Sequence, residues 1–292
     1  MIDNVKTSVW SNQQLSLGEG PLTHHLRSSL IWCDINNSAI YEKHFTAAEV
    51  RKFDLPVMPS AAGIIDERSI LVATDLDFRV LDLDSGDTEP AIDFPEDSLM
   101  RSNDGRVHPS GAFWIGTMAK DGKGCPGAIY RLFDGKLTKM IDNVVTPNSI
   151  CFTADGSFAY YTDSSSRTIW KIATDPATGE VADDRTIFVE LANDVPGVPD
   201  GSVVDGEGNL WNARWGGSAV DVYNPQGQRI HSYPVPVRQP TCPSFIGDHL
   251  DQIVITSATA GLTPDTVGET DGTVIQIHVP VVGRSEPLVR WL

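Results

Sequence analysis

The sequence lacks long apolar segments and any regular helical pattern. No run of roughly 18 apolar residues, the length that crosses a membrane, occurs in the 292-residue chain. The opening stretch MIDNVKTSVWSNQQ has no apolar segment of a secretory signal peptide, so a cytoplasmic location is expected. No window combines helical periodicity with capping residues. The sequence therefore predicts neither a transmembrane nor a helical protein, although its 40% hydrophobic content is enough to build a core.

Cysteine and positive charge are also scarce. The four cysteines, Cys33, Cys125, Cys151 and Cys242, are scattered without C-x-x-C spacing, which argues against zinc ribbons and disulfide scaffolds. The formal net charge of −17 disfavours binding to nucleic acid or to anionic membranes, because both require positive surface. No G-x-S-x-G segment is present, so a serine hydrolase has no visible nucleophile. The expected partner is a small molecule, and the sequence carries no sign of the oligomeric state.

A unit consisting of a polar turn and a short apolar strand recurs six times. The turns are centred on Arg27, Glu67, Ser110, Asp155, Gly206 and Asp248, about 40 to 51 residues apart. This period is typical of propeller blades. We therefore predict an all-β fold, a six-bladed β-propeller of four-stranded blades, in a single domain over residues 1–292. A pair of β-sandwiches would also have many short strands, but it would not predict a repeat of about 45 residues.

Each unit is followed by a similar third strand. Residues 38–41 and 127–130 read Ser-Ala-Ile-Tyr and Gly-Ala-Ile-Tyr, and turn residues and a weaker fourth strand complete the repeat. Because a propeller closes on itself, a strand from one terminus usually completes the blade of the other. Residues 6–10 are therefore predicted to pair with the last blade.

Polar residues precede the inner strand at the same point of each repeat. Counting back six to eight residues from the turn centres reaches Glu19, Ser60, Asn103, Asn148, Asp200 and Thr241. The innermost strands of a propeller line its central channel, so these positions should meet at one mouth. Each Asp or Asn alone is an ordinary turn former. Only their shared position within the repeat favours a metal site.

The chemistry of these side chains predicts the kind of ion. Two carboxylates brought together at the mouth, Glu19 and Asp200, would repel each other and lose hydration unless a cation neutralised them. Carboxylate and amide oxygens, without Cys or His in the ring, suit a hard divalent ion such as Ca²⁺, Mg²⁺ or Mn²⁺.

Six short motifs are spread in order over essentially the whole chain. They are Gly18-Glu19-Gly20-Pro21, Arg101-x-Asn103-Asp104-Gly105, Gly116-Thr117-Met118, Pro147-Asn148, Pro199-Asp200-Gly201 and Leu210-Trp211. Each motif is weak alone, but the ordered set resembles the senescence-marker-protein/gluconolactonase family, the regucalcin-like lactonases. Members of this family hydrolyse aldonolactones, and relatives in the wider fold hydrolyse organophosphates.

The resemblance implies a site as well as a fold. It implies one divalent ion bound through Glu19, Asn148 and Asp200, with Ca²⁺ favoured and Mg²⁺, Mn²⁺, Zn²⁺ or Fe²⁺ as alternatives. It also implies that Arg101 and Asn103 hold the hydroxyls and ring oxygens of a sugar lactone.

The loop after Gly-Thr-Met departs from the family pattern. Where some relatives have a glutamate, this chain has Asp121, a shorter carboxylate that we also expect to contact substrate. Residues 122–127 match G-x-G-x-x-G, but a dinucleotide site needs that motif to open a helix in a βαβ unit. Here the motif joins two predicted strands and contains Pro126, so no dinucleotide cofactor is expected.

Lactone hydrolysis also fits these residues on chemical grounds. A lactone is an ester, and a bound cation can both polarise its carbonyl and lower the pKa of water. Asp200 is the expected general base, because it can reach both the water and the carbonyl carbon. Arg101 offers fixed planar donors, and Asn103 adds an amide. Two alternatives stay open: a phosphotriesterase-type hydrolase, which would want a more apolar pocket, and a non-catalytic cation-binding propeller.

Overall fold

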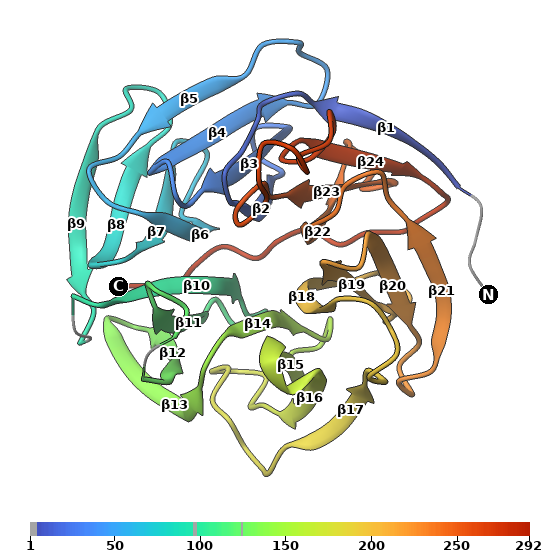
Figure 1. Cartoon of the computed structure of the whole chain (residues 1–292). Helices are drawn as coiled ribbons and strands as arrows, with labels where there is room; N and C mark the ends of the chain where they lie inside the picture. Colours follow the sequence, from blue (N-terminus) through green and yellow to red (C-terminus); the bar gives the residue numbers. More distant parts are fainter. Residues whose placement is uncertain (1–4, 96–97, 124) are drawn as a thin grey trace.

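Six four-stranded antiparallel sheets stand around a central axis in the computed structural model, which describes residues 5–95, 98–123 and 125–292 (Figure 1). The predicted six-bladed β-propeller is confirmed. In the described part of the chain the one helical element is a short 3₁₀ turn, η1 (Ser164–Ser166). None of the described helical segments has the length and apolar character needed to cross a membrane.

The blades follow one another along the chain, each starting with its innermost strand. The first three blades consist of β2 (Gly18–His24), β3 (Ser29–Asp34), β4 (Ala39–His44) and β5 (Arg51–Asp54); β6 (Pro59–Ile64), β7 (Ser69–Thr74), β8 (Asp77–Asp82) and β9 (Thr88–Asp93); and β10 (Met100–Val107), β11 (Phe113–Ala119), β12 (Gly127–Phe133) and β13 (Lys136–Val144). The next two consist of β14 (Pro147–Phe152), β15 (Phe158–Asp163), β16 (Thr168–Ala173) and β17 (Thr186–Glu190); and β18 (Val198–Val204), β19 (Leu210–Trp215), β20 (Ala219–Tyr223) and β21 (Arg229–Pro234).

The sixth blade joins the two ends of the chain. Its strands β22 (Pro240–Ile246), β23 (Gln252–Ser257) and β24 (Val274–His278) are completed by β1 (Lys6–Ser11). Strand β1 pairs antiparallel with β24, starting with Lys6 opposite His278. The predicted closing strand is thus confirmed, and it pairs with the outer edge of β24.

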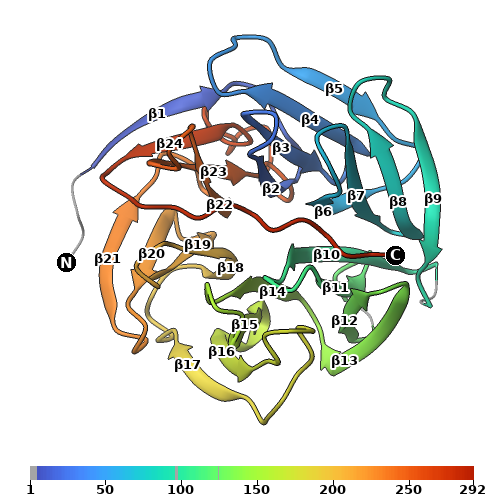
Figure 2. The ribbon, with the colours of Figure 1, turned by 180° about the vertical axis from the view of Figure 1, so that it is seen from behind.

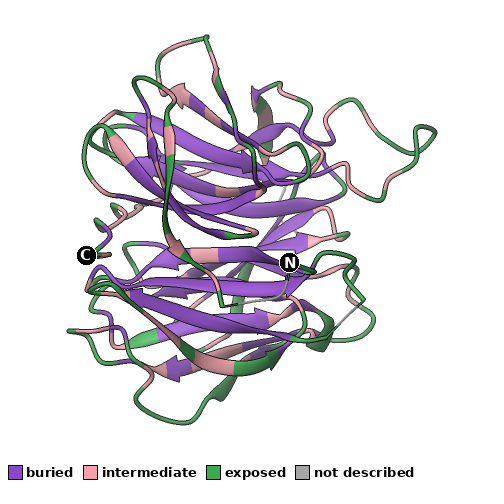
Figure 3. Cartoon of the chain, turned by 90° about the vertical axis from the view of Figure 1, so that its left-hand side faces the viewer, coloured by how far each residue is buried: buried purple, intermediate pink, exposed green. Residues whose placement is uncertain are grey.

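Burial decreases from the inner to the outer strands of a blade (Figure 3). All residues of β3, β11 and β22 are buried, whereas most of β9 is exposed. The second strand of a blade is buried on both faces, which explains why strands such as β7 (SILVAT) and β23 (QIVITS) read as nearly continuous apolar runs rather than alternating patterns. Trp114, for example, is fully buried and packs against Ile150 and Phe152 of the next blade.

A bulge interrupts the innermost strand of every blade. The register between the first and second strands shifts at Glu19/Leu22, Pro59/Ala61, Ser102/Gly105, Asn148/Cys151, Pro199/Ser202 and Pro240/Pro243. A bulge changes the direction in which side chains point and often lies beside a functional site. In β2 and β14 it includes a left-handed residue, Gly20 (φ 55°) and Ser149 (φ 58°).

The last residues, 279–292, cross the centre of the ring on the face seen in Figure 2. This C-terminal segment bonds to residues at the ends of inner strands or just after them. Val289 N donates to Ile64 O at 2.7 Å, and Gly206 N donates to Val282 O at 2.6 Å. Because the predicted site residues lie at the starts of the inner strands, the C-terminal segment covers the opposite mouth of the channel.

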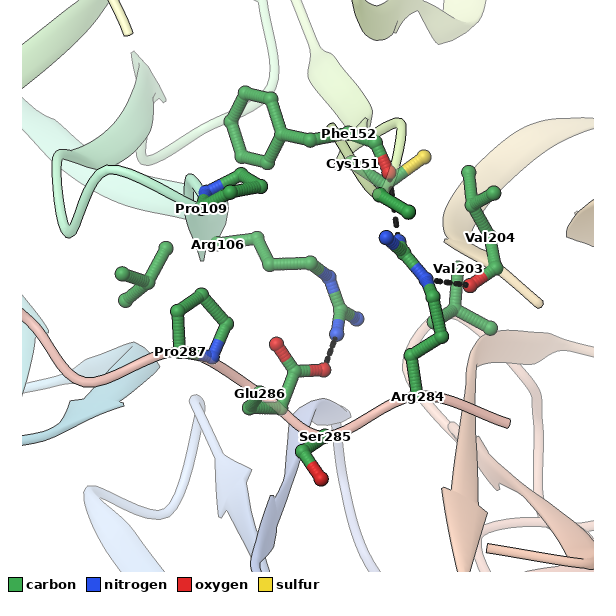
Figure 4. Close-up of a pocket in the computed structure, with 12 residues that line it drawn as sticks. Arg106, Pro109, Cys151, Phe152, Val203, Val204, Arg284, Ser285, Glu286 and Pro287 are labelled. Carbon is green, nitrogen blue, oxygen red and sulfur yellow. Dashed lines mark hydrogen bonds and ion pairs between the residues drawn. The ribbon is translucent and has the colours of Figure 1, made fainter. Parts of the chain in front are cut away.

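Charged side chains hold the C-terminal segment in place around a cavity of about 250 Å³ (Figure 4). Arg284 donates from Nη2 to Phe152 O at 2.8 Å and from Nε to Val204 O at 3.1 Å. Glu286 forms a buried ion pair with Arg106 of β10. Blades three, four and five are thereby tied to the same segment.

The G-x-G-x-x-G match leads into a strand rather than a helix. Gly127, its last residue, opens β12, and a Cβ there would collide with Thr117 O of the neighbouring strand. This glycine is therefore explained by close strand packing. Gly124, inside the match, lies outside the described residues.

Candidate metal and substrate site

The structure brings the predicted site residues together around one cavity of about 580 Å³. Four blades contribute predicted residues to its polar part: Glu19 from β2, Arg101 and Asn103 from β10, Asn148 from β14 and Asp200 from β18. Asn103 and Asp200 lie within the bulges of their strands, and Glu19, Arg101 and Asn148 lie at or just before theirs. Residues at equivalent positions of these repeats therefore lie close together in the channel.

The two remaining ring positions do not line this cavity. Ser60 and Thr241 are fully buried on β6 and β22. Ser60 Oγ donates to Ser102 Oγ at 2.6 Å, and Thr241 Oγ1 donates to Gly18 O at 2.5 Å. Their hydroxyls thus connect neighbouring blades instead of reaching a ligand.

Arg101, Asn103 and Asn148 form one hydrogen-bonded group. Arg101 donates through Nη1 to Asn103 Oδ1 at 2.7 Å and to Ser102 O at 2.8 Å. Asn103 donates through Nδ2 to Asn148 Oδ1 and to Pro147 O, both at 2.9 Å. Both protons of the Asn103 amide are therefore used, and a ligand hydroxyl can only donate to the remaining lone pair of its oxygen.

Two buried carboxylates, Glu19 and Asp200, stand beside this group with 7% and 3% of their surface exposed. Burial, and then the charge of Asp104, raises the pKa of Glu19 from 4.5 to about 8. Burial, and then the charges of Glu19 and Asp104, raises the pKa of Asp200 well above its ordinary value. Among the ion pairs of the described residues, none includes either carboxylate. Without a cation, Glu19 would hold a proton near neutral pH, and ionisation of Asp200 would be disfavoured.

Asp104 is a third buried carboxylate that sequence reasoning passed over. It is 5% exposed, and its Oδ2 accepts a hydrogen bond from Ile150 N at 2.7 Å. Burial raises its pKa to about 6. Strand alternation places it on the face opposite to Asn103, so only the bulge in β10 and the packing of the next blade reveal its proximity to the site.

The fully described part of the chain contains no group of three or more His, Cys, Asp or Glu side chains arranged to hold a metal. The expected ligand set has two carboxylates and one carboxamide. It therefore differs from a group of three His, Cys, Asp or Glu side chains, because one of its members is an Asn. A cation there would be bound by oxygen atoms of Glu19, Asn148 and Asp200, together with water or substrate.

Asp121 lies at the rim of the cavity and is exposed. Its Oδ1 accepts a hydrogen bond from Lys123 N at 2.8 Å, which orders its own loop. Next to it, Lys120 pairs with Asp75 at 2.7 Å. Of the residues predicted to bind substrate, Asp121 is thus the one that lies at the edge rather than at the base of the cavity.

Apolar side chains also line the cavity, which the sequence did not predict. They are Leu17, Met58, Met118, Val198 and Trp215. These residues come from the ends of strands in different blades or from loops, so no periodicity in the sequence groups them. The cavity therefore combines apolar side chains with a small number of convergent polar groups, the usual make-up of a small-molecule site.

Known proteins resemble this chain over most of their length. The solved structure of regucalcin from Agrobacterium tumefaciens strain C58, described as a calcium-binding protein, matches with a TM-score of 0.95 and 36% identity over 98% of both chains. Pentonolactonase XacC of Haloferax volcanii is 34% identical, covering 92% of this chain and 93% of its own. L-Arabinolactonase of Azospirillum brasilense is also 34% identical, covering 87% of this chain and 85% of its own.

The family match covers the blades that carry the site. Residues 17–259 match the family described as SMP-30/Gluconolactonase/LRE-like region, and this range includes Glu19, Arg101, Asn103, Asn148 and Asp200. On the strength of this family match and of these relatives, the chain belongs to the SMP-30/gluconolactonase/LRE-like family.

Proposed function

We propose that this protein hydrolyses a sugar lactone to the open-chain sugar acid, with one divalent cation held by Glu19, Asn148 and Asp200. The observation that carries the proposal is the pair of buried carboxylates, Glu19 and Asp200, in a cavity that also contains Arg101. Relatives named as lactonases support the reaction, and a relative described as calcium-binding supports the cation.

The residues fit a cation because neither carboxylate forms an ion pair with a described side chain. Burying two ionised carboxylates without compensation costs several kcal/mol per group. Arg101 is the cation whose charge acts on both, but its hydrogen bonds to described residues go to Ser102 O and Asn103 Oδ1 instead. A hard ion with oxygen ligands, Ca²⁺ above all, would neutralise Glu19 and Asp200 directly.

When bound, the cation would supply Lewis acidity to the lactone carbonyl. Asp200 would act as general base, taking the proton of the water that attacks the carbonyl carbon. The bond between the carbonyl carbon and the ring oxygen then breaks, and the ring oxygen takes up a proton to become a hydroxyl group. The product is a hydroxy acid with the same carbon chain.

Arg101 would orient the substrate. Both of its hydrogen bonds to described residues use Nη1, so Nε and Nη2 are available to the oxygens of a lactone. Burial lowers the pKa of Arg101 from 12.5 to about 10, which still leaves it charged at neutral pH. Its planar donors can hold two adjacent oxygens at once. Asp121 at the rim would contact the part of the substrate that faces solvent.

The variants Asp200→Asn and Arg101→Ala test these roles. Asp200→Asn removes a charged ligand and the base, so both Ca²⁺ affinity and lactone turnover should be lost. Arg101→Ala removes a positive charge beside the cation, so Ca²⁺ affinity should be kept or increased. Its kcat/KM on lactones should still fall about tenfold or more, the scale of one charge-assisted hydrogen bond.

The measurements are calorimetric titration with Ca²⁺ and hydrolysis of a panel of aldono-1,4- and aldono-1,5-lactones, with and without chelator. If Arg101→Ala lost the cation while Asp200→Asn kept it, the two assigned roles would be wrong. Ca²⁺ binding by the unmodified protein without turnover of any lactone would indicate a cation-binding propeller. Turnover of a phosphotriester in place of lactones would indicate the other hydrolase class.

A further inference from the structure

We propose that Ser164 is a positioning residue that sets the orientation of the Asn148 amide and links it to the backbone before Asp200. The inference rests on the proposed function, because it concerns two of the residues assigned to the cation. Ser164 lies in η1, between β15 and β16, and is 7% exposed. It was not among the residues that the sequence suggested.

Ser164 is the last side chain in a continuous series of hydrogen bonds across three blades. Arg101 Nη1 donates to Asn103 Oδ1 at 2.7 Å, and Asn103 Nδ2 donates to Asn148 Oδ1 at 2.9 Å. Asn148 Nδ2 then donates to Ser164 Oγ at 2.8 Å, and Ser164 Oγ donates to Pro199 O at 2.7 Å. The series connects blade three to blade five through the residue directly before Asp200.

The two ends of the series fix its direction. A guanidinium can only donate hydrogen bonds, and a backbone carbonyl can only accept them. Asn103 must therefore turn its oxygen toward Arg101 and its NH₂ group toward Asn148. Asn148 in turn has its oxygen on the side of Asn103 and its NH₂ group toward Ser164. The amide orientations follow from the chemistry of the partners, although oxygen and nitrogen of an amide have nearly the same shape.

This orientation matters for a cation site. The oxygen of Asn148 can bind a cation through its second lone pair, whereas an NH₂ group in its place would repel one. Without the hydroxyl of Ser164, the NH₂ group would lose its acceptor and Pro199 O would lose its donor. Partners that orient a ligand commonly contribute a factor of about 10 to 100 in metal affinity.

The backbone around Ser164 holds the hydroxyl in place. Ser164 N donates to Thr146 O at 3.1 Å, and Arg167, with φ at 58°, closes the turn by donating from its N–H to Ser164 O at 3.2 Å. The Arg167 guanidinium also donates to Gly197 O and Val195 O, both at 2.8 Å, in the loop that leads to β18. The turn and the strand that carries Asp200 therefore form one hydrogen-bonded unit.

Three variants test the inference: Ser164→Ala, Ser164→Thr and Ser165→Ala. Ser164→Ala should weaken Ca²⁺ binding about 10- to 100-fold in a calorimetric titration. Ser164→Thr keeps a hydroxyl and should recover most of the affinity. Ser165→Ala is the matched control, because Ser165 lies in the same turn but its Oγ donates to Asp163 on the exposed side. It should bind Ca²⁺ as the unmodified protein does.

The melting temperature of each chelated variant separates positioning from simple stability. A Ser164→Ala protein that melts at a lower temperature but binds Ca²⁺ with unchanged affinity would overturn the inference. So would equal losses of affinity in Ser164→Ala and Ser165→Ala, or no recovery in a Ser164→Thr protein that melts like the unmodified one. An unmodified protein that binds no divalent ion would overturn the proposed function and this inference together. Unchanged affinity in Ser164→Ala alone leaves the proposed function standing.

Discussion

Buried carboxylates dominate the chemistry of this protein at the scale of single residues. Glu19, Asp104 and Asp200 are each at most 7% exposed, and burial is the largest cause of the raised pKa of each one. Such an arrangement is unfavourable for folding unless the groups stay protonated or meet a positive charge. The site is therefore expected to exchange protons for a cation, and the exchange should be measurable.

The pH dependence of stability gives a direct test. The pKa of Glu19 rises from 4.5 to about 8 on folding, so the folded state binds more protons than the unfolded state between these values. The free energy of unfolding of the chelated protein should therefore fall as pH rises from about 4.5 to about 8, by up to about 1.4 kcal/mol per pH unit for one proton.

The contribution of Glu19 is isolated by comparison with Glu19→Gln. Other groups also titrate, so the quantity to measure is the difference between the two proteins in urea unfolding at each pH. This difference should shrink when Ca²⁺ is added to the unmodified protein, because the cation replaces the proton. A difference that does not change with pH would contradict the assigned pKa.

The bulges in the inner strands are the decisive feature at the scale of elements. The first of them includes Gly20, directly after Glu19, with φ at 55°. A Cβ on Gly20 would collide with Ser60 O in the next blade. The glycine thus permits both the left-handed backbone and the close approach of β2 and β6, and through them it places the Glu19 side chain.

Gly20→Ala should destabilise the protein and weaken Ca²⁺ binding. Its matched control is Gly135→Ala, because Gly135 has φ at 70° but a Cβ added there would meet nothing within 4 Å. The control should cost about 1–2 kcal/mol, the strain of a left-handed backbone for a residue with a side chain. Gly20→Ala should cost clearly more in urea unfolding, and it alone should reduce Ca²⁺ affinity. Equal costs would mean that the contact with Ser60 has no effect.

At the scale of the whole molecule, both ends of the chain contribute to closure. Strand β1 completes the sixth blade and so closes the ring, and the C-terminal segment covers one mouth of the channel. The Arg106–Glu286 pair inside the channel is nearly buried, with 10% of each side chain exposed. Removing one partner of a buried pair leaves an uncompensated charge, which costs about 3–5 kcal/mol. The C-terminal segment therefore contributes to stability at the mouth opposite to the site.

Glu286→Gln should accordingly lower the free energy of unfolding by about 3–5 kcal/mol in urea titrations. Asp134→Asn provides the control, because Asp134 pairs with Arg290 of the same segment at 2.6 Å on the exposed surface. It should change stability by about 0–1 kcal/mol. Comparable effects of the two substitutions would show that burial of the channel pair does not matter.

The sequence alone determined the repeat, and the repeat determined the fold. Six copies of one strand pattern can bury their apolar faces only by stacking, and a period of about 45 residues gives four short strands per copy. The same periodicity predicted that Glu19, Asn103, Asn148 and Asp200 would meet, because equivalent positions in a closed ring surround one axis. Residues 6–10 could be assigned to the last blade for the same reason.

Tertiary structure decided what the repeat could not encode. Asp104 and Ser164 contact the strand of Asn148 from a bulge and a turn, and the apolar residues of the cavity, Trp215 among them, come from strand ends and loops of different blades. Ser60 and Thr241 share the phase of the site residues, yet their short hydroxyls bond to neighbouring blades. Periodicity fixes where a Cα lies around the axis, but side-chain length and the local backbone fix what each residue touches.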